Sequence, residues 1–330
     1  MHGECRIFRL GVLALGAMVV YALAGSVPAR AADKIRVGKA AAVGFSFSVL
    51  DVGVEKGYYR DAAIEIENLN FSGAAKVEQA IAAGAIDIGL SAGTDLALLA
   101  KGVPAKCIAA LAGPPYDIAI IVGRDSPIRT LDDLRGKRLS ASTAGGSMME
   151  WMAKELVRVK GWNRDEVTSV AVGVERTAKL AALRTNAVDG VLDAPGMAFQ
   201  LEAQGDGRLL ALASEFVKDF MVHGIYAGNA FLAQKPDAAR RFLAAWFKTI
   251  AFMRGNRDET VRLIAKAIGT DEASTAKEYD LEMPMFSTDG KFDPAAIAKL
   301  ASSFVELKLL DGPVDLSKFY TEEFLPGNGG

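Results

Sequence analysis

Glycines and small hydroxyl residues follow three of the strands that the sequence predicts. Glycine lets the backbone approach a ligand closely, and a helix start offers unpaired N–H donors with a partial positive charge. An anion at such an end gains about 0.3–1 kcal/mol in exposed settings. We therefore expect these loops to bind a small ligand, although each is alternatively an ordinary N-cap turn. The candidates are Gly44, Phe45, Ser46, Ser91, Gly93, Thr94, Thr143, Gly145, Gly146 and Ser147.

Phe45 and a further candidate, Asp193, each have a second interpretation. Phe45 supplies an apolar wall to the ligand or is simply a core residue. Asp193 follows a further predicted strand, where it orients a donor group of the ligand or caps the next helix.

One motif points to an enzyme. Residues 89–93 read GLSAG and fit the G-x-S-x-G nucleophile elbow of an α/β-hydrolase, between a predicted strand and a predicted helix. Ser91, Asp193 and His223 even follow in the order nucleophile, acid, base. No His-Gly-Gly oxyanion loop precedes Ser91, however, and small residues are common after strands. A secreted esterase is therefore an alternative to ligand binding, and we expect the chain not to be an enzyme.

Composition excludes several other classes of protein. The chain has 330 residues with 38 basic and 40 acidic side chains, a net charge of −2, and no long run of like charges, so nothing predicts a nucleic-acid partner. Its 2 Cys and 2 His show no metal-ligand spacing, which predicts no metal site. Walker, dinucleotide-binding and H-E-x-x-H motifs are missing as well, and we expect no cofactor.

The elements that position these residues alternate between strands and helices. This order predicts an α/β protein with mainly parallel sheets flanked by helices, and ligands bind beyond the carboxyl ends of such strands. A purely helical tail begins at about Pro236. The predicted strands cover residues 35–38, 64–67, 86–90, 105–111, 117–122, 138–142, 167–172, 188–192 and 209–213. The predicted helices cover residues 47–58, 74–83, 95–101, 147–159, 176–184, 197–204, 237–254, 257–268, 272–283 and 294–307.

The N-terminus has the pattern of an export signal. Arg6 and Arg9 precede an apolar run over residues 10–24, and Ala-Arg-Ala at residues 29–31 is a small-x-small cleavage pattern. The run is too short for a comfortable span of a bilayer of about 30 Å, so an uncleaved anchor is the weaker alternative. Cleavage after Ala31 leaves Cys107 as the one thiol, which cannot form an internal disulfide. We expect an exported, soluble protein.

Four segments resemble a known family. They read GVEKGYY at residues 53–59, GAIDIG at 84–89, LDDLRGKR at 131–138, and ALR followed by VDG within 182–190. Over residues 34–325 the chain resembles the periplasmic solute-binding proteins of ABC importers, in the group that binds nitrate, sulfonate, taurine and thiamine precursors. The DLRGKR element, which enters a strand and then a Gly-Ser helix start, is the most specific part.

The resemblance implies a type II periplasmic binding protein fold with two lobes and two hinge crossings, near Val122 and Met221. Lobe 1 would then hold residues 32–121 and 222–330, and lobe 2 residues 122–221. It further implies a monomer that captures a small solute by lobe closure and delivers it to the permease and ATPase of an ABC importer. A ligand-sensing receptor subunit is the alternative within this fold. The ligand loops of the family correspond here to residues 44–46, 91–94 and 145–147.

The chain also departs from some members of this group. No Arg or Lys falls in the corresponding loops, which favours a neutral or weakly anionic organic solute with an apolar part over nitrate or a sulfonate. The Cys-rich iron motif of the pyrimidine-making members is missing, so that activity is not expected.

Overall fold

The computed structural model describes residues 31–141, 147–306 and 308–327. Nearly all of the predicted signal peptide lies outside the described residues, as do the predicted ligand residues Thr143, Gly145 and Gly146. The fold described below begins at Asp33.

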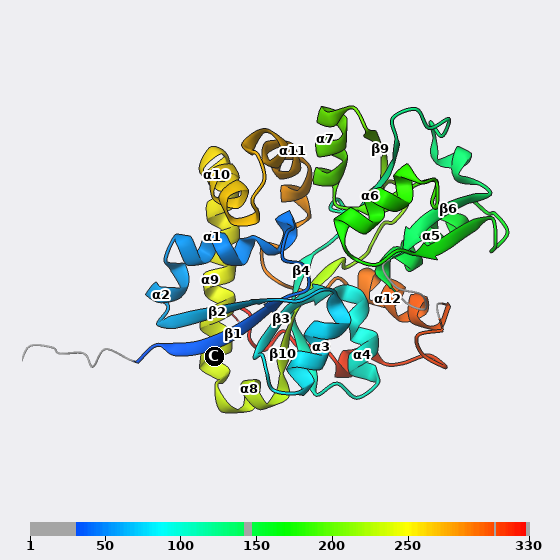
Figure 1. The fold of residues 1–330 in the computed structure, drawn as a ribbon. Helices are drawn as coiled ribbons and strands as arrows, with labels where there is room; N and C mark the ends of the chain where they lie inside the picture. Colours follow the sequence, from blue (N-terminus) through cyan, green and yellow to red (C-terminus); the bar gives the residue numbers. More distant parts are fainter. Residues whose placement is uncertain (1–30, 142–146, 307, 328–330) are drawn as a thin grey trace, which may run out of the picture. The chain divides into compact units, whose positions relative to one another are not determined.

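The first sheet is parallel except for one strand. Its order is β2-β1-β3-β10-β4 (Figure 1). The strands β1, β2 and β3 run parallel, and β10 lies antiparallel between β3 and β4. The bounds are β1 Asp33–Lys39, β2 Ile64–Asn70, β3 Ile88–Ala92, β4 Ala105–Ala112 and β10 His223–Gly228.

The second set of strands repeats this plan. β6 pairs with β7 in parallel, and a parallel bridge between Leu139 and Gly190 joins β6 to the segment that leads into β8. β5 then lies antiparallel between β8 and β9. β10 and β5 are the antiparallel strands of the two sets. Each is the first strand that the chain forms after it crosses from the other set. The bounds are β5 Ala119–Gly123, β6 Lys137–Ala141, β7 Val167–Ala171, β8 Val191–Asp193 and β9 Gly207–Leu212.

Helices flank both sets of strands, as the alternating pattern predicts. After β10 the chain is helical, and α9 and α10 pack against α1 (Figure 1). Pro236 occupies the first turn of α9, where its missing N–H costs little. The helices are α1 Val49–Glu55, α2 Tyr58–Asp61, α3 Ala74–Ala82, α4 Leu96–Ala100, α5 Met148–Val159, α6 Arg176–Arg184, α7 Pro195–Gln204, α8 Asn229–Gln234, α9 Pro236–Gly255, α10 Arg257–Ile268, α11 Glu272–Glu282 and α12 Pro294–Glu306. None of the helices in the described ranges is long and apolar enough to cross a bilayer.

Most elements match the prediction within a few residues. The strand β10 and the short helices α2 and α8 were not predicted. β5 pairs with β8 and β9 and so belongs to the second set of strands, while the lobe boundaries near residues 122 and 221 stay predictions. The chain connects the two sets of strands through residues 113–118 and returns through residues 213–222. The predicted mainly parallel α/β architecture is confirmed.

Candidate functional site

A buried hydrogen-bond cluster joins three segments that are far apart in sequence. Ser46, in the short 3-10 turn η2 (Phe45–Phe47), donates to Asp117 Oδ2 at 2.7 Å. The same oxygen lies 2.5 Å from His223 Nε2. Ser46 follows β1, Asp117 lies in the first connection, and His223 begins β10 after the second connection. The cluster therefore fixes both connections to the loop after β1.

The cluster lies at the edge of the first sheet where ligands bind in this kind of fold. His223 pairs with Ala92 and Ala112, the last residues of β3 and β4, so it marks the carboxyl ends of these strands. Burial raises the pKa of Asp117, but the His223 ring and the hydrogen bonds from His223 and Ser46 outweigh it and hold this pKa below its ordinary value. Asp117 is thus a buried, ionised carboxylate at neutral pH.

Helix α11 brings two more acids to this place. Glu278 and Glu282 are four residues apart, so they share one face of the helix, and both are buried. Burial, then repulsion from Glu278 and Asp117, raises the pKa of Glu282 well above its ordinary value. Burial also raises the pKa of Glu278 to about 7, against the opposing influence of Arg176. The repulsion between Asp117 and Glu282 shows that the first connection and α11 share one electrostatic environment.

Glu278 reaches from α11 to the second half of the molecule. Its carboxylate accepts a hydrogen bond from the Gly196 N–H in the first turn of α7. A Cβ at Gly196 would lie only 2.0 Å from Glu278 Oε1, so glycine permits this close approach. A helix N-terminus favours a carboxylate at that position. The contact therefore links the first set of elements to the second.

Aromatic rings border the acids. The Phe45 ring meets Tyr279 of α11 edge-on, with the centroids 6.1 Å apart, and it also contacts Phe286. The Phe47 ring centroid is 4.8 Å from that of His223. Phe45 is buried, as the core interpretation expects, and its role as an apolar wall for the ligand stays a prediction.

Several polar atoms of this cluster have no hydrogen-bond partner among the described residues. They are Asp117 Oδ1, His223 Nδ1 and both carboxylate oxygens of Glu282. A buried polar group without a partner costs about 1–3 kcal/mol. Apart from the His223 nitrogen, which takes either role, all of these atoms are acceptors when the carboxyls are ionised. The arrangement is therefore suited to binding donor groups.

The structure places the other predicted loop residues differently. Ser91 has no exposed surface, and its Oγ donates to Asp95 within the same turn. Thr94 is buried, and the Gly93 N–H donates to Val222 O at 2.9 Å. A Cβ at Gly93 would lie 1.9 Å from Met221 O. This loop thus holds the second connection against β3, and a direct contact with a solute stays a prediction.

The remaining described candidates make local contacts. Ser147 is the N-cap of α5 and accepts from the Glu150 N–H at 3.2 Å. Asp193 receives Lys179 Nζ at 2.9 Å, and its other oxygen accepts from the N–H of Ala194, the N-cap residue of α7. Gly44 precedes η2, and its carbonyl accepts from Ser48 Oγ at 2.8 Å. Ser147 therefore caps its helix and Asp193 does not, and a contact of any of them with a solute stays a prediction.

The esterase triad is contradicted by these contacts. Ser91 bonds to Asp95, Asp193 pairs with Lys179, and His223 pairs with Asp117, so none of the three meets another. The glycines of the motif have packing roles instead. Gly89 lets α3 pack on β3, because a Cβ there would lie 2.6 Å from Val77 Cγ1, and Gly93 meets the second connection.

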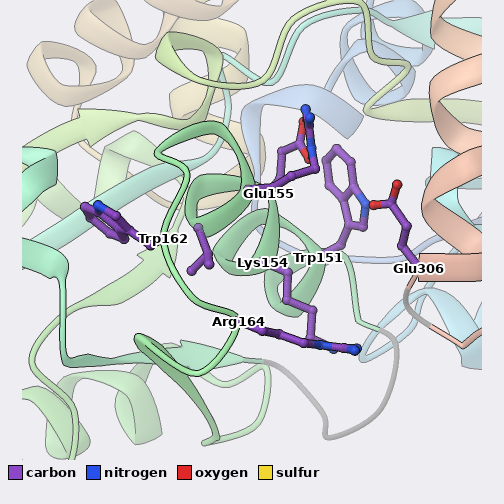
Figure 2. Close-up of a pocket in the computed structure, with 8 residues that line it drawn as sticks. Trp151, Lys154, Glu155, Trp162, Arg164 and Glu306 are labelled. Atoms are coloured by element: carbon purple, nitrogen blue, oxygen red, sulfur yellow. The ribbon is translucent and has the colours of Figure 1, made fainter.

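Two cavities open elsewhere, along α5 and α12. One measures ≈ 350 Å³ and is lined by Trp151, Glu155, Trp162 and Glu306, among others (Figure 2). The other, of ≈ 390 Å³, continues past Lys299 on α12. Neither is lined by the predicted ligand loops. Within the part of the chain that the structure describes, no group of three or more His, Cys, Asp or Glu is placed to hold a metal ion.

Sequence reasoning did not identify the acids of this cluster. Asp117 lay at the start of a predicted strand, and His223 was considered only as a catalytic base. Glu278 and Glu282 lie on a predicted helix whose buried face is polar, so no apolar stripe marks that face. The available signal was a pair of acids at i and i+4 next to an aromatic residue, Tyr279.

Comparisons with known proteins give a consistent picture. The family model described as NMT1/THI5 like matches residues 45–260. The riboflavin-binding protein RibY of Chloroflexus aurantiacus is 24% identical over 295 residues, which cover 85% of this chain and 83% of RibY. The alkanesulfonate-binding protein SsuA of Xanthomonas axonopodis pv. citri, solved bound to MOPS, superposes with a TM-score of 0.75. At 17% identity the match covers 89% of this chain and 99% of that one.

The same fold also occurs in an enzyme. The desulfurization enzyme DszB superposes with a TM-score of 0.63 and 16% identity, covering 88% of this chain and 97% of the enzyme. At this identity the likeness shows the fold alone. The relatives reported above are binding proteins, and the predicted periplasmic binding protein fold is confirmed.

Proposed function

We propose that this chain, which belongs to the NMT1/THI5-like family, is the extracytoplasmic solute-binding component of an ABC importer. It captures a small organic solute by closure of two lobes and hands it unchanged to a membrane permease, which an ATPase drives. The solute lies at the carboxyl edge of the first sheet, against the second half of the molecule.

The observation that carries this proposal is the convergence of Ser46, Asp117 and His223. One carboxylate oxygen receives the loop after β1 and the start of β10, and it belongs to the first connection itself. A solute at this point therefore touches both connections between the halves. In hinge closure the connections take up the backbone rotation, so a solute held there contacts the segments that change conformation.

Contacts on either side of the connections support closure as the mechanism. Glu278 of α11 meets Gly196 of α7, and Lys299 of α12 meets Glu155 of α5 at 2.9 Å. Each of these pairs spans the proposed lobes. A solute that binds the closed arrangement better than the open one shifts the population by that difference alone.

The location of the protein follows from its N-terminus. We propose cleavage after Ala31 during export to the periplasm. Intact mass and N-terminal sequencing of the exported protein test this, with Ala32 as the expected first residue. A full-length mass in the membrane fraction would support the uncleaved anchor.

Binding is tested on the protein purified after export, without dialysis. Native mass spectrometry is expected to show a small molecule that is released unchanged by unfolding. Riboflavin and MOPS, named for the relatives, serve as first probes in thermal shift measurements. Small-angle X-ray scattering should report a smaller radius of gyration with a bound probe. Turnover of p-nitrophenyl acetate that Ser91→Ala abolishes would contradict the proposal.

A sensing role uses the same capture step with a different partner. Pull-down of a permease from solubilised membranes by the solute-loaded protein supports import. Capture of a receptor in place of a permease would favour the sensing role.

A further inference from the structure

The strongest unexplained feature of the site is Glu282. It is 1% exposed, and neither carboxylate oxygen has a hydrogen-bond partner within the described ranges. Asp117 Oδ1 and His223 Nδ1 share this condition, and both side chains are more than nine-tenths buried. These three residues come from α11, the first connection and β10, so the unpartnered atoms gather from separate elements.

In the described part of the chain, Glu282 is the acid of this place that has no cation beside it. The acids around it are Glu278 from α11 and Asp117 from the first connection, while Asp193 and Asp271 act in turn on Glu278. Asp117 is bonded to His223, Asp193 is paired with Lys179, and Arg176 acts on Glu278. A cation that reached Glu282 would allow this buried carboxyl to ionise, so the place favours an additional positive charge.

The geometry also selects the kind of group. Ionised carboxylates only accept hydrogen bonds, and bonds from a charged N–H to a carboxylate are about twice as strong as neutral ones. The rings of Phe45 and Phe47 border the same cluster, and aromatic faces attract cations. A sulfonate would instead bring a negative charge toward the ionised Asp117.

We propose that the solute presents a cationic nitrogen group with N–H donors to Glu282 and Asp117. The inference rests on the proposed function and makes it more specific, since it names the chemistry of the captured solute. It also replaces the neutral or weakly anionic solute that the loop composition favours. The apolar part of the solute then lies toward Phe45 and Phe47.

The test compares four probes that share a phenyl ring: benzylamine, benzamidine, benzyl alcohol and benzenesulfonate. Affinity is measured by calorimetry and thermal shift on the exported protein at pH 7.5. We expect the two cationic probes to bind at least about tenfold more tightly than the other two, because a hydrogen bond to a charged group contributes about 1.5–3 kcal/mol. The substitution Glu282→Gln should remove this preference.

The matched control is Glu272→Gln, on the exposed first turn of the same helix, which should leave every affinity unchanged. A second measurement does not depend on any variant. Calorimetry in buffers of different ionisation enthalpy should detect proton release when benzylamine binds, because the cation ionises Glu282.

The outcomes separate the inference from the proposed function. Tighter binding of benzenesulfonate or benzyl alcohol overturns the inference and leaves solute capture intact. Equal or undetectable binding of all four probes also overturns it, and capture is then judged by native mass spectrometry alone. If the folded Glu282→Gln variant still prefers the cationic probes, other residues cause the preference. That result overturns the role given to Glu282.

Discussion

Two buried glutamates, Glu155 on α5 and Glu282 on α11, have opposite surroundings. The side chain of Glu155 is 2% exposed, and it is met by Arg158 at 2.7 Å and by Lys299 at 2.9 Å. Glu282 is buried to the same degree and meets no cation among the described residues. Burial alone therefore does not distinguish a carboxylate that is paired within the fold from one that has no partner there.

The pKa values follow this difference. Burial raises the pKa of Glu155, but Arg158 and Lys299 outweigh it and leave the value below 4.5. For Glu282 nothing opposes burial, and the neighbouring acids Glu278 and Asp117 raise the pKa further. A third buried acid, Glu78 on α3, resembles Glu282 in having no partner, and burial together with Asp95 raises its pKa to about 9. Glu78 lies on α3 and has Asp95 as its acidic neighbour, whereas Glu282 lies on α11 and has Glu278 and Asp117, so the two acids belong to different surroundings.

The largest expected effect comes from removing one of the two cations that pair with Glu155. Lys299→Met leaves Glu155 buried with one cation, and we expect the free energy of unfolding to fall by about 2 kcal/mol. Urea denaturation followed by circular dichroism measures it. Lys266→Met removes a pair whose two side chains are exposed and should change stability by less than about 0.5 kcal/mol. Equal effects of the two variants would mean that burial of Glu155 is energetically unimportant.

Substitution of Glu282, which has no partner among the described residues, should change stability in the opposite direction. Glu282→Met removes a buried carboxyl that has no partner, and we expect the free energy of unfolding at pH 8 to rise by about 1–2 kcal/mol. The same urea titration, carried out without added solute, measures this gain in stability. A loss of stability would show that a bound water or another group already satisfies Glu282.

The pH dependence sharpens the comparison further. The depressed pKa of Glu155 contributes stability that is present above about 4.5 and is lost as the pH falls through its folded value. The raised pKa of Glu282 works in reverse, because the folded protein keeps the proton, and stability falls as the pH rises above 4.5. Glu155→Gln should therefore be least harmful at acidic pH, while the benefit of Glu282→Met should grow toward alkaline pH. Denaturation from pH 4 to pH 9 checks both trends, and parallel curves for the two variants would refute the distinction.

The smallest effect is expected where α7 meets α11. Gly196→Ala pushes a flexible carboxylate, Glu278, away from the Gly196 N–H. The lost hydrogen bond and the better helix propensity of Ala oppose each other, so stability should change by less than about 0.5 kcal/mol. Solute affinity is the sensitive readout, because the contact joins the proposed lobes. Unchanged affinity would exclude a role of this contact in closure.

Much of the fold was predictable because short β-branched runs and helical spacing mark the elements clearly. β10 was not, since its HGIYAG sequence begins and ends near glycines and holds a single β-branched residue. Its place in the sheet depends on β3 and β4, which lie more than a hundred residues earlier. Tertiary pairing thus overrides a weak local preference.

The site was predictable only in part. Ser46 belongs to a predicted loop and does join the cluster, whereas Ser91 bonds inward to Asp95. α11 was predicted as a helix, but its polar buried face cannot be recognised from periodicity, because Ser274, Thr275, Glu278 and Glu282 look like solvated positions. Thr143, Gly145 and Gly146 lie outside the described residues, and their role stays a prediction.

The position of β10 also constrains the order of events during synthesis. Because β10 lies between β3 and β4, the first sheet lacks an inner strand until residue 228 has been made. The strands β5 to β9 are complete by residue 212, so the second set of strands finishes before the first sheet. Contacts of such long sequence separation are slow to form. Until β10 inserts, β3 and β4 expose unpaired edges, and this interval is when the newly made chain most needs protection from aggregation.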